Sequence, residues 1–186
     1  MGIDFWTGAF LIVLLTGVYT VLGGLRAAVY TETIQTVVLL AGSAVTLIFG
    51  LQAIGGWNAM VETAGPDFMS IWKPSDHPEF PWTGIVLGAP ILGIWYWCTD
   101  QNIVQKVLSA KNISEARRGT IFAGFLKITP LFFFVIPGVI AFSLAAKGQL
   151  NLSSSDSALP TLIKTLLPSG LRGMVAAGLL AALMSS

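Results

Sequence analysis

The chain has 186 residues, of which 54% are hydrophobic and only 10% are charged, and its mean hydropathy is +0.78. Soluble domains carry about 25% charged residues, so this composition predicts an integral membrane protein and excludes a disordered chain. The net charge of +1 provides no basic footprint for nucleic acid. One cysteine and one histidine exclude an intramolecular disulfide framework and argue against a zinc site.

Five apolar stretches predict five transmembrane helices, because about 20 apolar residues cross the hydrocarbon core of a bilayer. They cover about residues 6–22, 27–52, 82–101, 119–146 and 170–186, and the last stretch is still apolar where the sequence stops. We therefore interpret the chain as an internal fragment of a longer all-α membrane protein. It forms one partial membrane domain over residues 1–186.

The charges of the connections predict an orientation for these helices. Residues 102–118 contain four basic residues and one acid, whereas residues 53–81 contain four acids and one lysine. Basic loops stay in the cytoplasm, so 102–118 is predicted to be a cytoplasmic loop and 53–81 an external loop. The length of the external loop predicts an ordered flap or a short interfacial helix. His77 lies there and is interpreted as a solvated loop residue.

The third apolar stretch contains Gly88-Ala-Pro-Ile-Leu-Gly93 near its middle, followed by Trp95, Tyr96 and Trp97. Proline removes a backbone donor and glycine permits unwinding, so we expect a broken helix whose free backbone groups bind a polar solute. The aromatic rings beyond the break would offer flat faces to a sugar ring. A simple proline kink followed by interfacial aromatic residues is the alternative.

Lys127 lies nine residues into the fourth apolar stretch, where a lysine costs about 2.5–3.5 kcal/mol on insertion scales unless it finds water or a partner. It either faces a hydrated cavity, where it can donate hydrogen bonds to a hydroxylated solute, or extends to the cytoplasmic surface. The residues alone leave both open. Pro130 and Pro137 predict a bend in the same helix.

The last apolar stretch ends in Ala182-Leu-Met-Ser185-Ser186, whose hydroxyl groups and free carbonyl groups are hard oxygen ligands suited to Na⁺. Serine in membrane helices also bonds to its own helix, which is the alternative. Glu32 is either an acid at a helix start, favoured by the helix dipole, or part of an ion exit route. Motifs for covalent catalysis are missing from the sequence, so the chain is not predicted to be an enzyme.

Three runs of residues resemble one family. The run Trp95-Tyr-Trp-Cys-Thr-Asp-Gln101 is the most specific, and the others are Gly23-Gly-Leu-Arg-Ala-Ala-Val-Tyr-Thr-Glu-Thr-Ile-Gln35 and Pro168-x-Gly-Leu-Arg-Gly173. All three are similar to the sodium/glucose cotransporter branch of the solute:sodium symporters. The resemblance implies a five-plus-five inverted-repeat fold in which the five helices are core helices four to eight. The broken sixth core helix would fall on Gly88–Gly93.

The resemblance also implies roles for individual residues. Near the solute, it implies a tyrosine gate at Tyr96, the following tryptophan at Trp97 and a sugar-contacting lysine at Lys127. Gly93 occupies a position where relatives carry a polar side chain that faces the sugar. Sodium would be bound by the carbonyl of Ala182 and the hydroxyls of Ser185 and Ser186, and Glu32 would assist its release. Because glycine cannot make the side-chain bond expected at Gly93, the identity of the solute stays open.

These implications predict sodium-coupled symport of a glucose- or galactose-like sugar across the plasma membrane by alternating access. Sodium would be the coupling ion, and no cofactor is expected. The alternatives are a sodium symporter for another solute, such as an inositol or an organic acid, and a transporter-like membrane sensor. Since the first core helix and the last two are not in the sequence, this stretch alone is not expected to concentrate sugar or to bind Na⁺ tightly.

Overall fold

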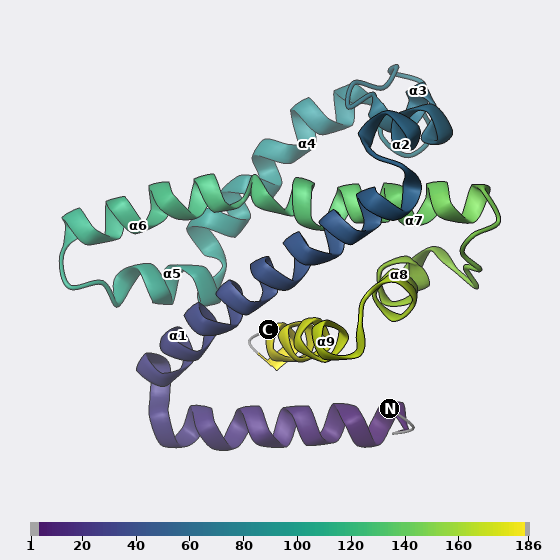
Figure 1. Ribbon diagram of the computed structural model, residues 1–186. Coiled ribbons are helices and arrows are strands. Elements are labelled where there is room, and N and C mark those ends of the chain that lie inside the picture. The colour runs from purple at the N-terminus through teal and green to yellow at the C-terminus, as the bar shows by residue number, and fades with distance from the viewer. Residues whose placement is uncertain (1–3, 185–186) are drawn as a thin grey trace. The chain divides into compact units, whose positions relative to one another are not determined.

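The computed structural model describes residues 4–184, and all regular elements in that range are helical (Figure 1). The chain forms two compact units. The first combines Met1–Gly56 with Leu131–Ser186, and the second is Trp57–Pro130. Because all regular elements of residues 4–184 are helices, the expected all-α class is confirmed.

Two helical stretches, Trp6–Ile54 and Ile113–Ala146, are long and apolar enough to cross a membrane, and Ser169–Leu180 is a shorter apolar helix. The first of these stretches contains two of the predicted transmembrane helices, 6–22 and 27–52. The division into five spans stays a prediction.

Helix α1 (Phe5–Ile54) bends sharply at Gly24 in the first unit (Figure 1). Its start is capped by Asp4, whose Oδ2 accepts the N–H groups of Trp6 and Thr7 over 3.1 and 3.4 Å. Gly24 has φ 60° and ψ −164°, a conformation that is essentially restricted to glycine. The bend lies between the first two predicted spans.

The first unit also contains η2 (Leu131–Val135), α7 (Ile136–Ala146), η3 (Ser155–Ser157), α8 (Ala158–Leu166) and α9 (Ser169–Met184). Of these elements, η2, α7, α8 and α9 pack against α1, and η3 packs against α8. The close contacts of α1 with α7 and α9 lie after the bend, at Val38, Leu39, Gly42 and Gly50. Helix α9 approaches α1 closely at Gly42, where an added Cβ atom would lie 2.9 Å from Cγ2 of Val175. Buried Ile163, Leu167 and Val175 form the core between α8 and α9. Helix α8 lies between the predicted spans 119–146 and 170–186.

The end of α1 is fixed by groups from two elements. Gly55 caps the helix in the left-handed conformation, with φ 97°. The ammonium group of Lys147, which follows α7, donates to the carbonyl oxygen of Ile54 over 3.3 Å. A cation at a helix C-terminus satisfies a free carbonyl group and is favoured by the helix dipole. This contact ties the ends of α1 and α7 together.

The second unit contains α2 (Trp57–Ala64), α3 (Pro66–Met69), α4 (Trp82–Ile94), η1 (Trp95–Thr99), α5 (Gln101–Leu108) and α6 (Ile113–Leu126). The helices α2 and α3 lie in the stretch predicted as an external loop, where an ordered flap or short helix was expected. The stretch predicted as a cytoplasmic loop, 102–118, is largely helical, and residues 109–112 connect α5 to α6. Asn112 caps α6 by accepting the N–H of Glu115 over 2.9 Å.

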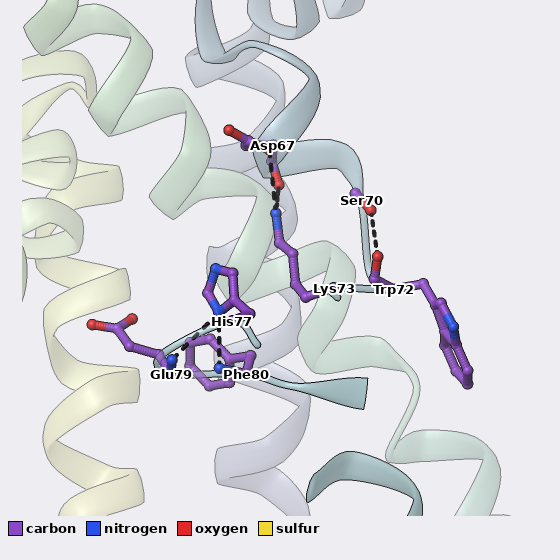
Figure 2. Close-up of polar contacts among 7 residues, drawn as sticks. All are labelled: Asp67, Ser70, Trp72, Lys73, His77, Glu79 and Phe80. Carbon is purple, nitrogen blue, oxygen red and sulfur yellow. Dashed lines mark hydrogen bonds and ion pairs between the residues drawn. The ribbon is translucent and has the colours of Figure 1, made fainter. Parts of the chain in front are cut away.

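The connection between α3 and α4 is held by polar contacts along its own length (Figure 2). The ammonium group of Lys73 lies 3.8 Å from Oδ1 of Asp67 and also donates to the carbonyl oxygen of that residue. The hydroxyl of Ser70 donates to the carbonyl oxygen of Trp72 over 3.0 Å. The ring of Trp72 in turn stacks on Trp82, with ring centres 6.0 Å apart, and thereby joins the connection to the start of α4.

His77 organises the last part of this connection. Its Nδ1 accepts the N–H groups of Glu79 and Phe80 over 3.3 and 3.1 Å (Figure 2). The residue is half-buried, and its ring lies 6.4 Å from that of Phe80. His77 was expected to be an ordinary solvated residue. Instead it satisfies two backbone donors and holds a turn.

Candidate functional site

Helix α4 runs unbroken from Trp82 to Ile94 and includes Pro90. The expectation of an unwound stretch at Gly88–Gly93 is therefore wrong. Proline removes one backbone donor, whereas unwinding the whole stretch would leave several amide and carbonyl groups without partners inside a membrane. Retaining the helix costs only the one hydrogen bond, so the chain stays helical through both glycines.

The helix is interrupted further along, in the π turn η1 and at Asp100. The N–H of Asp100 and the hydroxyl of Thr99 both donate to the carbonyl oxygen of Trp95, over 3.0 and 2.8 Å. Asp100 leaves the helical region with ψ 117°, and its Oδ1 caps α5 by accepting the N–H of Ile103 over 3.2 Å. Single π turns inside helices occur frequently at functional sites. The break of this helix is thus at Thr99–Asp100.

Tyr96 and Trp97 lie side by side in the π turn, and Lys127 contacts one of them. The two rings meet edge to face, with centres 5.3 Å apart and an interplanar angle of 83°. Lys127 follows the last residue of α6, and its ammonium nitrogen lies 3.8 Å from the centre of the Tyr96 ring. A cation over an aromatic face is attracted by the ring quadrupole. Lys127 therefore points toward Tyr96.

A groove of about 290 Å³ is lined by η1, α5, α6 and the connection between these two helices. Tyr96, Trp97 and Lys127 line one end. Glu115 lines the other end, because positions 115 and 127 are about 18 Å apart along α6 at 1.5 Å per residue. Lys106 of α5 also lines the groove. Small or apolar side chains form most of the wall between the ends: Ile103, Val107, Ala110, Ala116, Gly119, Thr120 and Ala123.

This combination suits a small, neutral, hydroxylated molecule. Aromatic side chains present large apolar faces, which match the C–H faces of a sugar ring. The ammonium group of Lys127 supplies three donors and no acceptor, so it can bind hydroxyl oxygens. Apolar walls with a few convergent polar groups are typical of small-molecule sites. The arrangement offers binding and orientation rather than a nucleophile with a base.

Gly93 lies one helical turn before Tyr96, but it is not among the residues that line this groove. An added Cβ atom would meet nothing within 4 Å. The residue therefore leaves open space on α4. Three of the four expected solute residues therefore line one groove, and Gly93 does not.

The residues expected to bind sodium lie in the first unit or outside the described residues. Ala182 belongs to α9 and is half-buried, whereas Ser185 and Ser186 lie outside the described residues. Glu32 is a half-buried residue of α1 whose carbonyl oxygen accepts the hydroxyl of Thr36 over 2.8 Å. The sodium site and the exit route stay predictions.

The sequence interpretation missed two residues that shape the site. Asp100 caps α5, and the signal was an aspartate followed by a short amphipathic segment, which is typical of a helix start. Thr99 bonds to the carbonyl group four residues before it, as threonines in helices commonly do. Both belong to the motif that carried the family resemblance, although neither was assigned a role.

The comparisons with known proteins identify the family. The model of the Sodium:solute symporter family matches residues 1–186. The chain is 35% identical over 221 residues to sodium/glucose cotransporter 1 of Sus scrofa, which covers all of this chain and 33% of that protein. It is 36% identical over 210 residues to sodium/glucose cotransporter 4 of Homo sapiens, covering 97% of this chain and 30% of that protein. It is also 35% identical over 217 residues to sodium/mannose cotransporter SLC5A10 of Bos taurus, covering all of this chain and 36% of that protein.

This chain belongs to the Sodium:solute symporter family. The resemblance to the symporters is thereby confirmed, and so is the expectation of an integral membrane protein that belongs to a family of transporters and not of enzymes. The chain spans about a third of the length of the curated relatives that it matches.

Proposed function

We propose that this sequence forms part of a longer symporter that couples the entry of Na⁺ to the transport of a sugar of the glucose or galactose type. The observation that supports this proposal is the groove in which Tyr96, Trp97 and Lys127 converge. The relatives named above are sodium/sugar cotransporters by their names, which agrees with a sugar as the solute.

The contact between Lys127 and Tyr96 gives the groove a way to respond to solute. In the structure, the ammonium group lies over the tyrosine ring, 3.8 Å from its centre. An entering sugar would offer hydroxyl oxygens to that ammonium group and a ring face to Tyr96, and would replace the internal contact. Tyr96 would then be free to move as a gate, and rocking of the helices would expose the groove to the other side.

Sodium would supply the driving force from a second site. We place it at the carbonyl group of Ala182 and the hydroxyls of Ser185 and Ser186, with Glu32 assisting release. One Na⁺ that moves through a membrane potential of 100 mV contributes about 2.3 kcal/mol before its concentration gradient is added. The setting is the plasma membrane, and the helices would be core helices four to eight of a five-plus-five repeat.

Initial uptake rates in proteoliposomes test the proposal. The full-length protein that carries this sequence would receive labelled glucose, galactose, inositol and lactate, each with an inward gradient of Na⁺ or of K⁺. We expect uptake of glucose or galactose that depends on Na⁺ and that Tyr96→Ala abolishes. Sugar binding without flux under either gradient would contradict symport and would favour a membrane sensor.

An organic anion is a second candidate solute, because two lysines, Lys106 and Lys127, line the groove against the single acid Glu115. A carboxylate would bind either ammonium group more strongly than a neutral hydroxyl does. Sodium-dependent uptake of lactate at a higher rate than that of glucose would favour this candidate.

A further inference from the structure

The carbonyl group of Trp95 is the fixed point of the π turn. It accepts the N–H of Asp100, five residues on, over 3.0 Å and the hydroxyl of Thr99, four residues on, over 2.8 Å. In an α-helix the donor at the fourth position would be a backbone N–H. Here the bond from the fourth position comes from a side chain.

Other threonines of the chain make the same local bond without widening their helix. The hydroxyl of Thr33 donates to the carbonyl oxygen of Val29 over 2.8 Å, and α1 remains regular there. The Thr99 hydroxyl therefore does not create the wide turn by itself. It adds a second donor to a carbonyl group that already bonds to the fifth residue, and so stabilises a turn that is otherwise less favourable than an α turn.

The turn decides where the two aromatic residues point. A π turn contains one residue more than the α-helical turn, so closing it to an α turn would rotate Tyr96 and Trp97 relative to α5. Both rings line the groove, and Lys127 on α6 contacts the face of Tyr96. Thr99 does not line that groove. Its influence on a solute would pass through the geometry of the turn alone.

We infer that Thr99 is a positioning residue for solute binding: its hydroxyl holds the wide turn that sets Tyr96 and Trp97 against Lys127. This role rests on the proposed function, because it takes the groove to be the solute site. It differs from a contact role, since the side chain acts on the Trp95 carbonyl group and not on the solute.

Two substitutions in the full-length protein separate the hydroxyl from the shape of the side chain. Thr99→Val keeps the shape and loses the donor, whereas Thr99→Ser keeps the donor. We expect Thr99→Val to raise the glucose concentration for half-maximal uptake about fivefold, the effect of losing one net hydrogen bond. Its half-saturating Na⁺ concentration and its maximal rate per transporter at the surface should stay within about twofold of the parent. Thr99→Ser should resemble the parent.

Thr33→Val is the matched control, because Thr33 makes the same type of bond in a regular part of α1. It should leave all three values unchanged. A purely structural weakening of the protein would instead lower surface abundance or maximal rate, and serine would not specifically rescue the half-saturation value. Parental half-saturation in Thr99→Val, or a serine variant that fails like the valine variant, would overturn the inference.

Cys98 provides a readout that does not depend on transport. This exposed thiol lies within the π turn, so closing the turn would move it. Its alkylation rate in the purified protein, followed by mass spectrometry of the peptide that contains it, should change at least threefold in Thr99→Val and not in Thr99→Ser. An unchanged rate in the valine variant would contradict the inference even if that variant failed to reach the membrane.

Tyr96→Ala distinguishes failure of this role from failure of the proposed function. If Tyr96→Ala leaves glucose uptake at the parental level, the groove is not the solute site and both proposals are wrong. If Tyr96→Ala abolishes uptake while Thr99→Val behaves as the parent in uptake and alkylation, only the positioning role is wrong.

Discussion

Replacing Lys127 with alanine in the full-length symporter removes an ammonium group that lines this groove and contacts Tyr96. A hydrogen bond from a charged donor to a solute hydroxyl contributes about 1.5–3 kcal/mol. To make it, the ammonium group must leave the tyrosine ring, which it contacts at 3.8 Å. Because Lys127 is exposed, that contact is worth about 0.5–1 kcal/mol. The net loss is about 1–2 kcal/mol, or roughly a 5- to 30-fold rise in the half-saturating solute concentration.

The assay is the initial rate of labelled glucose uptake into proteoliposomes over a range of glucose concentrations, at a fixed inward gradient of Na⁺. The amount of reconstituted protein should not fall in Lys127→Ala, because a lysine within an apolar helix opposes insertion. Lys127→Arg retains the charge and the ring contact, so its half-saturation should lie between those of the parent and the alanine variant.

Lys111→Ala is the matched control. Lys111 is exposed in the connection between α5 and α6, carries the same charge and does not line the groove. Its removal should leave the half-saturation value unchanged. If the half-saturating glucose concentration of Lys127→Ala stays within twofold of the parent while that of Tyr96→Ala does not, the ammonium group does not bind solute and the reasoning is refuted.

Three further substitutions test the packing, the break between helices and the sodium site. Gly42→Ala should destabilise the full-length protein by about 1 kcal/mol in reversible unfolding by detergent, because the new Cβ atom would lie 2.9 Å from Val175, and overpacking outweighs the gain in helix propensity. Gly17→Ala, which meets no atom within 4 Å in the same helix, should be neutral or stabilising, and equal effects of the two would contradict this packing. Asp100→Ala should cost roughly 1 kcal/mol by removing the cap of α5, and an unchanged exchange rate of the first amide hydrogens of α5 would rule that out. Ser186→Ala should raise the half-saturating Na⁺ concentration about tenfold with little effect at saturating Na⁺, consistent with the loss of one polar ligand to a cation, and a parental sodium requirement would remove this residue from the site.

The sequence, together with the family resemblance, selected three of the residues that line the groove, Tyr96, Trp97 and Lys127, and also Gly93, which does not line it. Lys127 was conspicuous because a charge within an apolar helix needs a partner or water. Tyr96 and Trp97 followed a proline-containing helix and belonged to the most specific motif of the resemblance. The structure places all three in one groove. Lys127 follows the two aromatic residues by about thirty positions, and this separation in the sequence does not by itself predict a contact between them.

The position of the break was not predictable from proline and glycine alone. Pro90 removes one backbone hydrogen bond, but its position in the sequence does not determine where the helix is interrupted. The helix is interrupted where side chains bond to backbone groups at the interruption. The Thr99 hydroxyl donates to the carbonyl oxygen of Trp95, and the Asp100 carboxylate accepts the N–H of Ile103. Such compensation depends on three-dimensional geometry, so the residue pattern pointed to Gly88–Gly93 instead.

Two short amphipathic helices were also not predicted, because only long apolar runs distinguish a membrane span from a connection in the sequence. Helices α5 and α8 have only 8 and 9 residues and carry polar side chains along one face. Each therefore resembled a polar connection. The boundary between the first two predicted spans, by contrast, agrees with the structure. Gly23 and Gly24 follow the first apolar stretch, and α1 bends at Gly24.

The most direct measurement is an experimental structure of the full-length protein with glucose and Na⁺ bound. The account predicts a sugar in the groove lined by η1, α5 and α6, with one face against the Tyr96 ring and a hydroxyl oxygen within hydrogen-bond distance of the Lys127 ammonium nitrogen. A sugar bound elsewhere, with that ammonium group still over the tyrosine ring, would contradict it.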